Sequence, residues 1–288
     1  MTAEVLQWVV NQLLKRQSVV LVTVLTTKGS VPGKTGSKMA MTSTETIGTI
    51  GGAGLELCVQ KRCLELITTK RSAFAEVLNF GLNKGAKGYE VTALDSLCGG
   101  QVTVSLELMI PMPHVLLFGA GHCAEALAKF LPTLNWEYSV HDTRNEFIEK
   151  SIFQSAKELH SGLVADFFEH ESASTLNRFS DIFLLGHDWS EDEERLVRLF
   201  KVLGHTTTKL NGKDAPRIGV IGSRSKWSAF SQTLLNEDVP QSMIDQIRCP
   251  IGLNIGAQSP EEIAIAVLAQ ILVDEKHVNP THPTWRNQ

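Results

Sequence analysis

The hydrophobic positions of this chain follow two periodicities that alternate along the sequence. Short apolar or alternating runs predict strands at residues 18–26, 46–50, 102–108, 115–118, 137–140, 158–164, 181–185 and 217–221. Between these runs, apolar residues recur every three or four positions, which predicts amphipathic helices over residues 4–15, 55–67 and 260–271 and after Ala124. Strands that alternate with helices are typical of the α/β class.

Pro111 and Pro113 divide the chain, because proline interrupts helices and sheet ladders. We predict an N-terminal α/β domain with glycine-rich loops over residues 1–110 and a loosely held tail over residues 277–288. Residues 111–276 are predicted to form a C-terminal Rossmann-like domain with a doubly wound parallel sheet. The continuous apolar runs in this part are typical of strands buried on both faces.

The strand at 115–118 leads into a glycine turn and a helix. Gly119, Gly121 and Ala124 form the pattern G-x-G-x-x-A: Gly119 permits the turn, Gly121 lets backbone approach a pyrophosphate, and Ala124 allows close helix packing. The next strand ends at Asp142, which has the spacing of an acid that binds a ribose 2′-hydroxyl, whereas Arg144 would favour a 2′-phosphate. The pattern predicts the fold more specifically than it predicts a ligand.

Two glycine-rich segments of the N-terminal part are candidate anion sites. The loop at 27–38 is cationic and rich in donors, with Lys28, Ser30 and Lys34 as candidate contacts, although a solvated hairpin connection would have the same composition. Gly51 and Gly52 lie between a predicted strand and a predicted helix, where free amides would face an anion. No Lys-Ser or Lys-Thr follows, so this is not a P-loop.

Three further candidates follow, of which the first two have a structural alternative. Cys98 precedes two glycines, so its thiol would reach a ligand, but a free cysteine is more commonly a buried structural residue. His187 and Asp188 follow a predicted strand at the ligand edge of the sheet, or they cap the next helix, for which Ser190 is also a good N-cap. A turn with hydroxyls and cations is a third candidate anion site, next to Trp227; its residues are Ser223, Arg224, Ser225 and Lys226.

Composition excludes several classes of protein. The net charge is −4, from 27 basic and 31 acidic residues, so nothing indicates nucleic-acid binding. The longest apolar runs are too short for a membrane helix, and the N-terminus lacks the features of a secretory signal. Five scattered cysteines without a C-x-x-C pair argue against a zinc site or a disulfide framework, so we expect a reducing cytoplasm.

Taken together, the motifs resemble one family, the xanthine dehydrogenase accessory proteins of the XdhC/CoxI type. The N-terminal motifs are TVLTTKGSVPGKTGSKM, GTIGGAGLE and the Cys98-Gly-Gly loop. The C-terminal motifs are LLFGAGHCAEAL, HDTR, LLGHD, IGVIGSRSKW and CPIGLNIGAQSPEEIA. Three positions depart from the common pattern: Lys34 stands where many members have arginine, Leu97 where many have a second cysteine, and Ala124 where a third glycine is common.

The resemblance implies a chaperone, not an enzyme, that binds the molybdenum cofactor (molybdopterin carrying molybdenum) as cargo. Such proteins protect the cofactor while a cysteine desulfurase supplies its sulfido ligand, and then pass it to apo-xanthine dehydrogenase, an enzyme of purine catabolism. The metal would be held by the pterin, with Cys98 as a candidate soft contact for molybdenum or sulfur. The cationic loop and the Gly51-Gly52 turn suit phosphate or pterin oxygens, and a cofactor between the two domains is the hypothesis that follows. A homodimer is expected.

Two other interpretations stay open at this point. The Rossmann unit either binds NAD(P) or holds no dinucleotide and helps to cradle the pterin or a partner. If it binds NAD(P), the chain is an oxidoreductase with His187 and Asp188 as its acid–base pair. A binding platform for the dehydrogenase alone would hold neither ligand.

Overall fold

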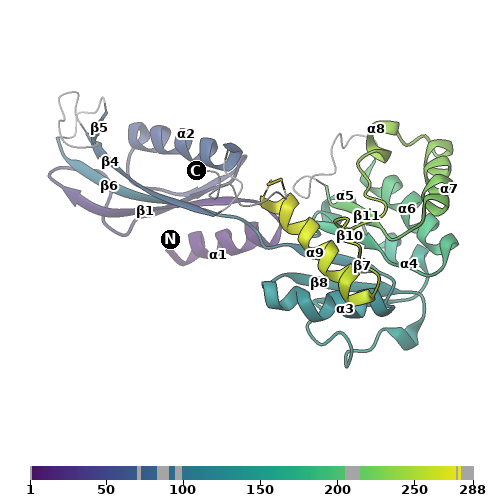
Figure 1. Ribbon diagram of the computed structural model, residues 1–288. Helices are drawn as coiled ribbons and strands as arrows, with labels where there is room; N and C mark the ends of the chain where they lie inside the picture. Colours follow the sequence, from purple (N-terminus) through teal and green to yellow (C-terminus); the bar gives the residue numbers. More distant parts are fainter. Residues whose placement is uncertain are drawn as a thin grey trace, which may run out of the picture. The chain divides into compact units, whose positions relative to one another are not determined.

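The computed structural model describes residues 2–69, 73–82, 91–94, 99–204, 215–276 and 278–279. The chain divides into two compact units, Met1–Pro111 and Met112–Gln288 (Figure 1), and each is described by itself. Cys98 lies outside the described residues, as does most of the predicted tail.

The N-terminal unit contains a six-stranded sheet with the order β3-β2-β1-β6-β4-β5. All neighbouring strands are antiparallel except β4 and β5, which are parallel. The strands are β1 (Val19–Lys28), β2 (Lys38–Met41), β3 (Thr46–Gly48), β4 (Phe74–Gly81), β5 (Val91–Ala93) and β6 (Gln101–Met109).

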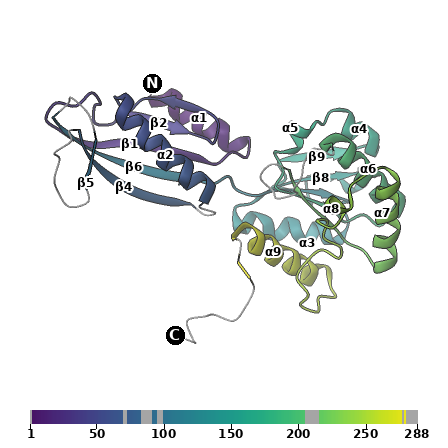
Figure 2. The same cartoon turned by 90° about the horizontal axis from the view of Figure 1, so that it is seen from above.

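Two helices cover opposite faces of this sheet, as Figures 1 and 2 show: α1 (Thr2–Leu14) and α2 (Ala53–Thr69). The apolar stripe of α1 packs its buried Val5 and Val9 against Val19 of β1. The longer α2 covers the other face, where it forms a core with Val20, Val22 and Val24 of β1 and with the even-numbered residues of β6. Most of the buried apolar surface of the unit therefore lies under α2.

A β-bulge changes the direction of the side chains near the end of β1. Val24 pairs with Val104, but the next pair is Thr26 with Thr103, so Leu25 is an extra residue. A bulge reverses which side chains point to which face beyond it. Val24 and Val104 pack under α2, and consequently Thr26 points to the opposite face of the sheet, together with Thr103.

The C-terminal unit contains a five-stranded sheet with the order β11-β10-β7-β8-β9, in which all strands are parallel. The strands are β7 (His114–Phe118), β8 (Glu137–Asp142), β9 (Glu158–Ser161), β10 (Asp181–Leu184) and β11 (Arg217–Val220). Counted along the chain this is the order 3-2-1-4-5 of the Rossmann fold, with its switch point between β7 and β10. The predicted two-domain α/β fold with a doubly wound parallel sheet is thus confirmed.

Helices cover both faces of this sheet (Figures 1 and 2). Val115 and Leu117 of β7 are buried with α3 (His122–Phe130) and α9 (Pro260–Lys276). Leu116 and Phe118, which point the other way, are buried with the remaining helices. These are α4 (Val164–Glu169), α5 (Ala173–Leu176), α6 (Trp189–Leu203), α7 (Arg224–Asn236) and α8 (Gln241–Ile244), and 3-10 turns cover Leu131–Leu134 and Asn145–Phe147.

One predicted strand extends into a helix of the structure. The apolar pattern predicts a strand over 158–164, but β9 ends at Ser161. Gly162 has a φ of +130°, which turns the chain, and Val164 already begins α4. The apolar residues beyond Ser161 therefore belong to the helix that packs on the sheet.

Candidate functional site

Three glycine motifs that lie far apart in the sequence meet in the N-terminal unit. A Cβ atom on Gly29 would lie 3.2 Å from the Cα of Gly100, and one on Gly100 would lie 2.5 Å from the carbonyl oxygen of Lys28. Likewise, a Cβ on Gly51 would lie 2.2 Å from the Cα of Gly33. These contacts are between backbones, so only glycine fits. We call residues 28–34, 49–52 and 99–100 the glycine cluster.

The predicted side chains of this cluster face solvent. Lys28, Ser30 and Lys34 are all exposed. Within the described residues, none of their side-chain donors makes a hydrogen bond or ion pair. The cluster thus offers ammonium and hydroxyl donors on a backbone that tightly packed glycines hold in place. Cys98 comes directly before Gly99 of this cluster in the sequence but lies outside the described residues, so its predicted role stays a prediction.

The amide of Gly51 is not free, in contrast to the sequence-based expectation. The carboxylate of Glu56, one turn into α2, accepts hydrogen bonds from the amides of Ile50 (3.1 Å) and Gly51 (3.2 Å) and from the hydroxyl of Thr49. Burial would raise the pKa of Glu56, but these bonds and one from the amide of Gly52 lower it below its ordinary value. The anion that Gly51 and Gly52 were predicted to bind is therefore an internal carboxylate.

The G-x-G-x-x-A turn has the predicted local geometry. Gly119 has a φ of +98°, and a Cβ there would lie 2.9 Å from the amide nitrogen of Gly186 at the end of β10. Gly121 is the N-cap of α3, and the space where its Cβ would lie is open. Ala124 is fully buried where α3 packs on the sheet. The turn therefore leaves space for a ligand to approach the backbone closely at Gly121.

Asp142 is already fully engaged, which corrects the prediction that it binds a ribose hydroxyl. Its Oδ2 accepts from the amide of Ala120 (2.8 Å) and from Nη2 of Arg144 (2.8 Å), and its Oδ1 accepts from the amide and Nε of Arg144 (both 2.9 Å). Burial favours a raised pKa, yet these bonds lower the pKa of Asp142 to about 2. Arg144 also stacks on Phe147, 3.8 Å from the ring centre. Four hydrogen bonds within the protein thus engage the carboxylate of Asp142.

The two candidates after β10 separate into different roles. Asp188 is the N-cap of α6, where its Oδ1 accepts from the amides of Ser190 (2.8 Å) and Glu191 (3.3 Å). The hydroxyl of Ser190, which also donates to Oδ1 (2.6 Å), together with these two amides lowers the pKa of Asp188. The capping alternative therefore holds for Asp188, and Ser190, the other predicted cap, is inside the helix. His187 is exposed.

The turn after β11 also differs from the anion site that its sequence predicts. Lys226 is only 4% exposed, and its Nζ donates to Asp192 (2.8 Å) and to the carbonyl of Ile221 (3.2 Å). Ser223 caps α7 by accepting from the amide of Lys226. Trp227 packs against the core instead of facing a ligand. Arg224 and Ser225 remain exposed.

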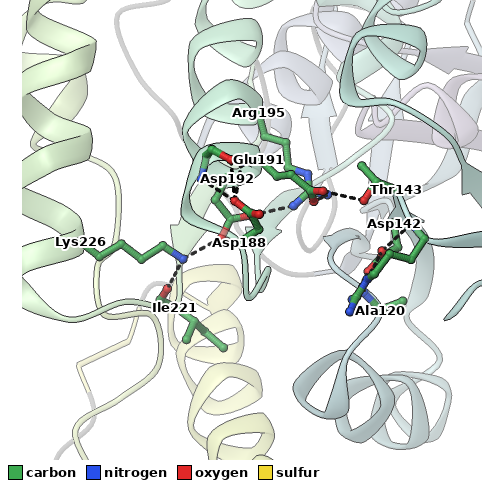
Figure 3. Close-up of polar contacts among 11 residues, drawn as sticks. Ala120, Asp142, Thr143, Asp188, Glu191, Asp192, Arg195, Ile221 and Lys226 are labelled. Atoms are coloured by element: carbon green, nitrogen blue, oxygen red, sulfur yellow. Dashed lines mark hydrogen bonds and ion pairs between the residues drawn. The ribbon is translucent and has the colours of Figure 1, made fainter.

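A buried polar network that sequence reasoning missed links three strand ends (Figure 3). Thr143 donates to Glu191 (2.7 Å), Arg195 donates to Glu191 (3.0 Å) and to Asp192 (2.8 Å), and Asp192 accepts from Lys226. Asp192 and Arg195 are fully buried. In the sequence SEDEER these residues have the spacing of an exposed, charged helix face. The residue in the sequence that could have indicated this buried network is Gly186, because a Cβ atom at that position would lie 2.5 Å from Asp192 Oδ1.

A second feature that the sequence did not indicate is a cavity of about 470 Å³ between β8, β9 and α4. Its lining includes three imidazoles, of which His141 is 1% exposed, and burial lowers the pKa of His141 to about 4. Within the described ranges, no group of three histidine, cysteine or acidic side chains is arranged to hold a metal ion. The cavity is lined by His141, Leu159, His160, Ser161, Asp166, Phe167, His170 and Glu171.

Comparison with protein families agrees with this architecture. Residues 115–271 match the XdhC Rossmann domain, and residues 13–81 match the XdhC and CoxI family. The first match covers more than half of the chain. The chain belongs to the XdhC family. The family resemblance read from the sequence motifs is therefore confirmed, and β7 to α9 are the elements of the XdhC Rossmann domain.

Two curated relatives are similar to this chain. It is 26% identical over 267 residues to the uncharacterized protein YqeB of Escherichia coli K12, and 28% identical over 174 residues to a probable xanthine dehydrogenase subunit of Bacillus subtilis 168. The alignments cover 91% and 58% of this chain. They cover 45% and 44% of the relatives, so the XdhC-family chain spans less than half of their length.

Solved structures add a distant likeness. A crystal structure of a xanthine dehydrogenase from Bacillus halodurans is 18% identical, covers 99% of both chains and has a TM-score of 0.46. An NAD+-bound xylitol dehydrogenase is 16% identical over 47% of this chain and 67% of its own, with a TM-score of 0.27.

None of the helices in the described part of the chain is long and apolar enough to cross a bilayer.

Proposed function

We propose that this XdhC-family chain is an accessory protein that binds the molybdenum cofactor as cargo, supports its sulfuration and delivers it to apo-xanthine dehydrogenase. The observation that carries the proposal is the glycine cluster, in which three segments that resemble family motifs meet and present the exposed side chains of Lys28, Ser30 and Lys34. The Bacillus subtilis relative, which is named as a probable subunit of xanthine dehydrogenase, supports the link to that client. Cytoplasmic location, a cysteine desulfurase partner and a homodimer belong to the same proposal.

The exposed donors of the cluster suit the anionic part of this cargo. Molybdopterin carries a phosphate, a flat pterin and a soft dithiolene that holds the metal. Lys28 and Lys34 are exposed cations that would bind the phosphate, and the hydroxyl of Ser30 adds a neutral donor. Cys98, next to Gly99, is the proposed soft contact for the metal or for the incoming sulfur. No acid or base of the Rossmann unit is needed for this role.

Retention of the cargo tests the proposal. The full chain is purified from cells that make the molybdenum cofactor, and molybdenum and oxidised-pterin fluorescence are measured per chain. We expect both in the wild type, a loss of at least fivefold in Lys28→Ala/Lys34→Ala, and reduced retention or reduced sulfuration of the cofactor in Cys98→Ala. Cys58→Ala, which changes a half-buried cysteine of α2, is the matched control. Wild-type protein that carries neither molybdenum nor pterin would overturn the proposal.

The alternative function, an NAD(P)-dependent oxidoreductase, has less support from the geometry. The order of the strands and the open space at Gly121 favour a dinucleotide. However, Asp142 is bonded to Arg144, and Asp188 caps α6, so neither carboxylate is free for the role this function requires. Titration with NADH and NADPH, followed by an assay of hydride transfer, separates the two functions. Tight binding with substrate-dependent oxidation, and no pterin, would favour the oxidoreductase.

A further inference from the structure

A polar cavity lies on the face of the N-terminal sheet that is opposite to α2. Its volume is about 190 Å³. Complete small-molecule sites usually occupy about 300–1,000 Å³, so this cavity has room for one ring system of a larger ligand. It is lined by Thr26, Lys28, Asn79, Phe80, Val91, Gln101, Val102 and Thr103.

The strand register aligns the polar residues of this cavity in two rows. In the first row, Thr103 of β6 lies between Thr26 of β1 and Asn79 of β4. The second row lies two positions away along each strand, so its residues point to the same face of the sheet as those of the first row. The bulge at the end of β1 is what brings Thr26 into this row, since without it the residue would point toward α2.

The second row crosses the same strands. Gln101 lies between Lys28 of β1 and Gly81 of β4. Gly81 is buried and has no side chain, so the polar side chains of this row are the long amide of Gln101 and the ammonium group of Lys28.

The hydrogen bonds leave the cavity rich in donors. Thr103 Oγ1 donates to Asn79 Oδ1 at 2.8 Å, which fixes this carboxamide and leaves its –NH₂ group to donate. In the described residues, neither the side chain of Gln101 nor the ammonium of Lys28 is used in another hydrogen bond or ion pair. Among the described residues, the lining contains one cation and no carboxylate. Such a site selects an anionic molecule with several acceptors.

We propose that this cavity binds the pyrimidinone edge of a pterin ring. That edge presents the carbonyl oxygen and N1 as acceptors and the amino group and N3–H as donors. The –NH₂ group of Asn79 can donate to these acceptors, and the carboxamide of Gln101 can donate or accept. Lys28 contacts the anionic part of the same molecule. This inference rests on the proposed function, because it assigns the ring contacts of its cargo. Gly29 and Gly100, which follow and precede the cavity strands, touch each other, so the ring site continues directly into the glycine cluster.

Free neopterin, which has the ring but neither phosphate nor metal, is the probe that tests the ring site. The full chain is titrated into neopterin and the pterin fluorescence is followed. We expect Asn79→Ala/Gln101→Ala to raise the Kd at least tenfold. Ser105→Ala, two positions along β6 on the same face but outside the cavity, should leave the Kd within twofold. Far-ultraviolet circular dichroism confirms that each variant is folded.

The Lys28→Ala variant distinguishes binding of the pterin ring from binding of its anionic group. It should raise the Kd of neopterin by less than threefold and that of neopterin monophosphate by at least tenfold, whereas Lys61→Ala on α2 should change neither. Wild-type protein that does not bind neopterin, or a double variant that binds it as tightly as the wild type, overturns the ring site. If the double variant also retains as much molybdenum and pterin as the wild type, the ring site fails while the proposed function stands. If the wild type retains no cargo, the proposed function fails, and the neopterin titration still decides the ring site.

Discussion

The charged side chains of the glycine cluster in the N-terminal unit differ in exposure and pairing from those at the carboxyl edge of the C-terminal sheet. In the glycine cluster the backbones are packed against each other, and the cations Lys28 and Lys34 are left exposed. At the carboxyl edge, Asp192, Arg195 and Lys226 are buried, and Asp192 pairs with both cations. Donors that are unpaired and solvent-facing are available to a ligand, whereas a closed network of ion pairs is a structural element. The comparison favours the N-terminal unit as the binding site and the Rossmann edge as a scaffold.

The largest expected effect comes from opening the buried network. Asp192→Ala leaves the cations of Arg195 and Lys226 buried without their shared carboxylate. Breaking a buried ion pair from one side costs about 3–5 kcal/mol. We therefore expect a loss of that size in the free energy of unfolding of the C-terminal unit, measured with urea and tryptophan fluorescence.

The control for this variant is Glu194→Ala, which removes a partner of Arg198 on the exposed side of the same helix. Exposed pairs contribute only about 0–1 kcal/mol. Equal losses for the two variants would contradict a closed, buried network at the carboxyl edge.

The glycine cluster is tested by adding a single methyl group. In Gly51→Ala the new Cβ meets the backbone of Gly33 at 2.2 Å, and the φ of +103° is unfavourable for alanine. We expect a loss of about 2–3 kcal/mol in the stability of the N-terminal unit. Gly36→Ala is the matched control, because Gly36 has a φ of +87° with no atom near its Cβ position. A difference of zero between the two variants would mean that the loops are not in contact.

The engaged state of Asp142 predicts a specific dependence on pH. Its pKa falls from 3.8 to about 2 in the folded chain, so its contribution to stability is present above pH 3.8 and is lost as the pH falls through about 2. A shift of this size corresponds to ~2 kcal/mol. Between pH 5 and pH 2, wild-type protein should lose that much more unfolding free energy than Asp142→Asn. If the unfolding free energies of the wild type and of Asp142→Asn fell in parallel with pH, the carboxylate would be free for another partner.

The smallest effect distinguishes a cap from a catalytic acid. Asp188→Ala removes the side chain that accepts from the amides at the start of α6, and loss of an N-cap costs about 1 kcal/mol. Asp188→Asn, which can still cap, should restore most of this stability. Thermal unfolding measures both variants. Restored stability together with lost hydride transfer in Asp188→Asn would instead support the oxidoreductase.

The local patterns of the sequence predicted the α/β class of both units and the Rossmann sheet, but they did not predict β2, β4 and β5 of the N-terminal sheet. The apolar runs located the parallel strands, and Gly119, Gly121 and Ala124 located the turn between β7 and α3, because buried strands and tight turns restrict residue type directly. The same patterns were less informative about charged residues. Lys226 and Asp142 look like ligand-binding residues in the sequence, but each is bonded to another side chain of the protein in the structure.

The sequence by itself determined which residues must be small or apolar, and with them the family, the two units and the Rossmann topology. Only the tertiary structure decided which polar groups are free. The partner of a polar group can lie far away in the chain, as Asp192 does from Lys226 and Gly100 does from Gly29. Hydrophobic periodicity reports the environment of a residue along its own element, whereas hydrogen bonding depends on atoms that folding brings within about 3 Å.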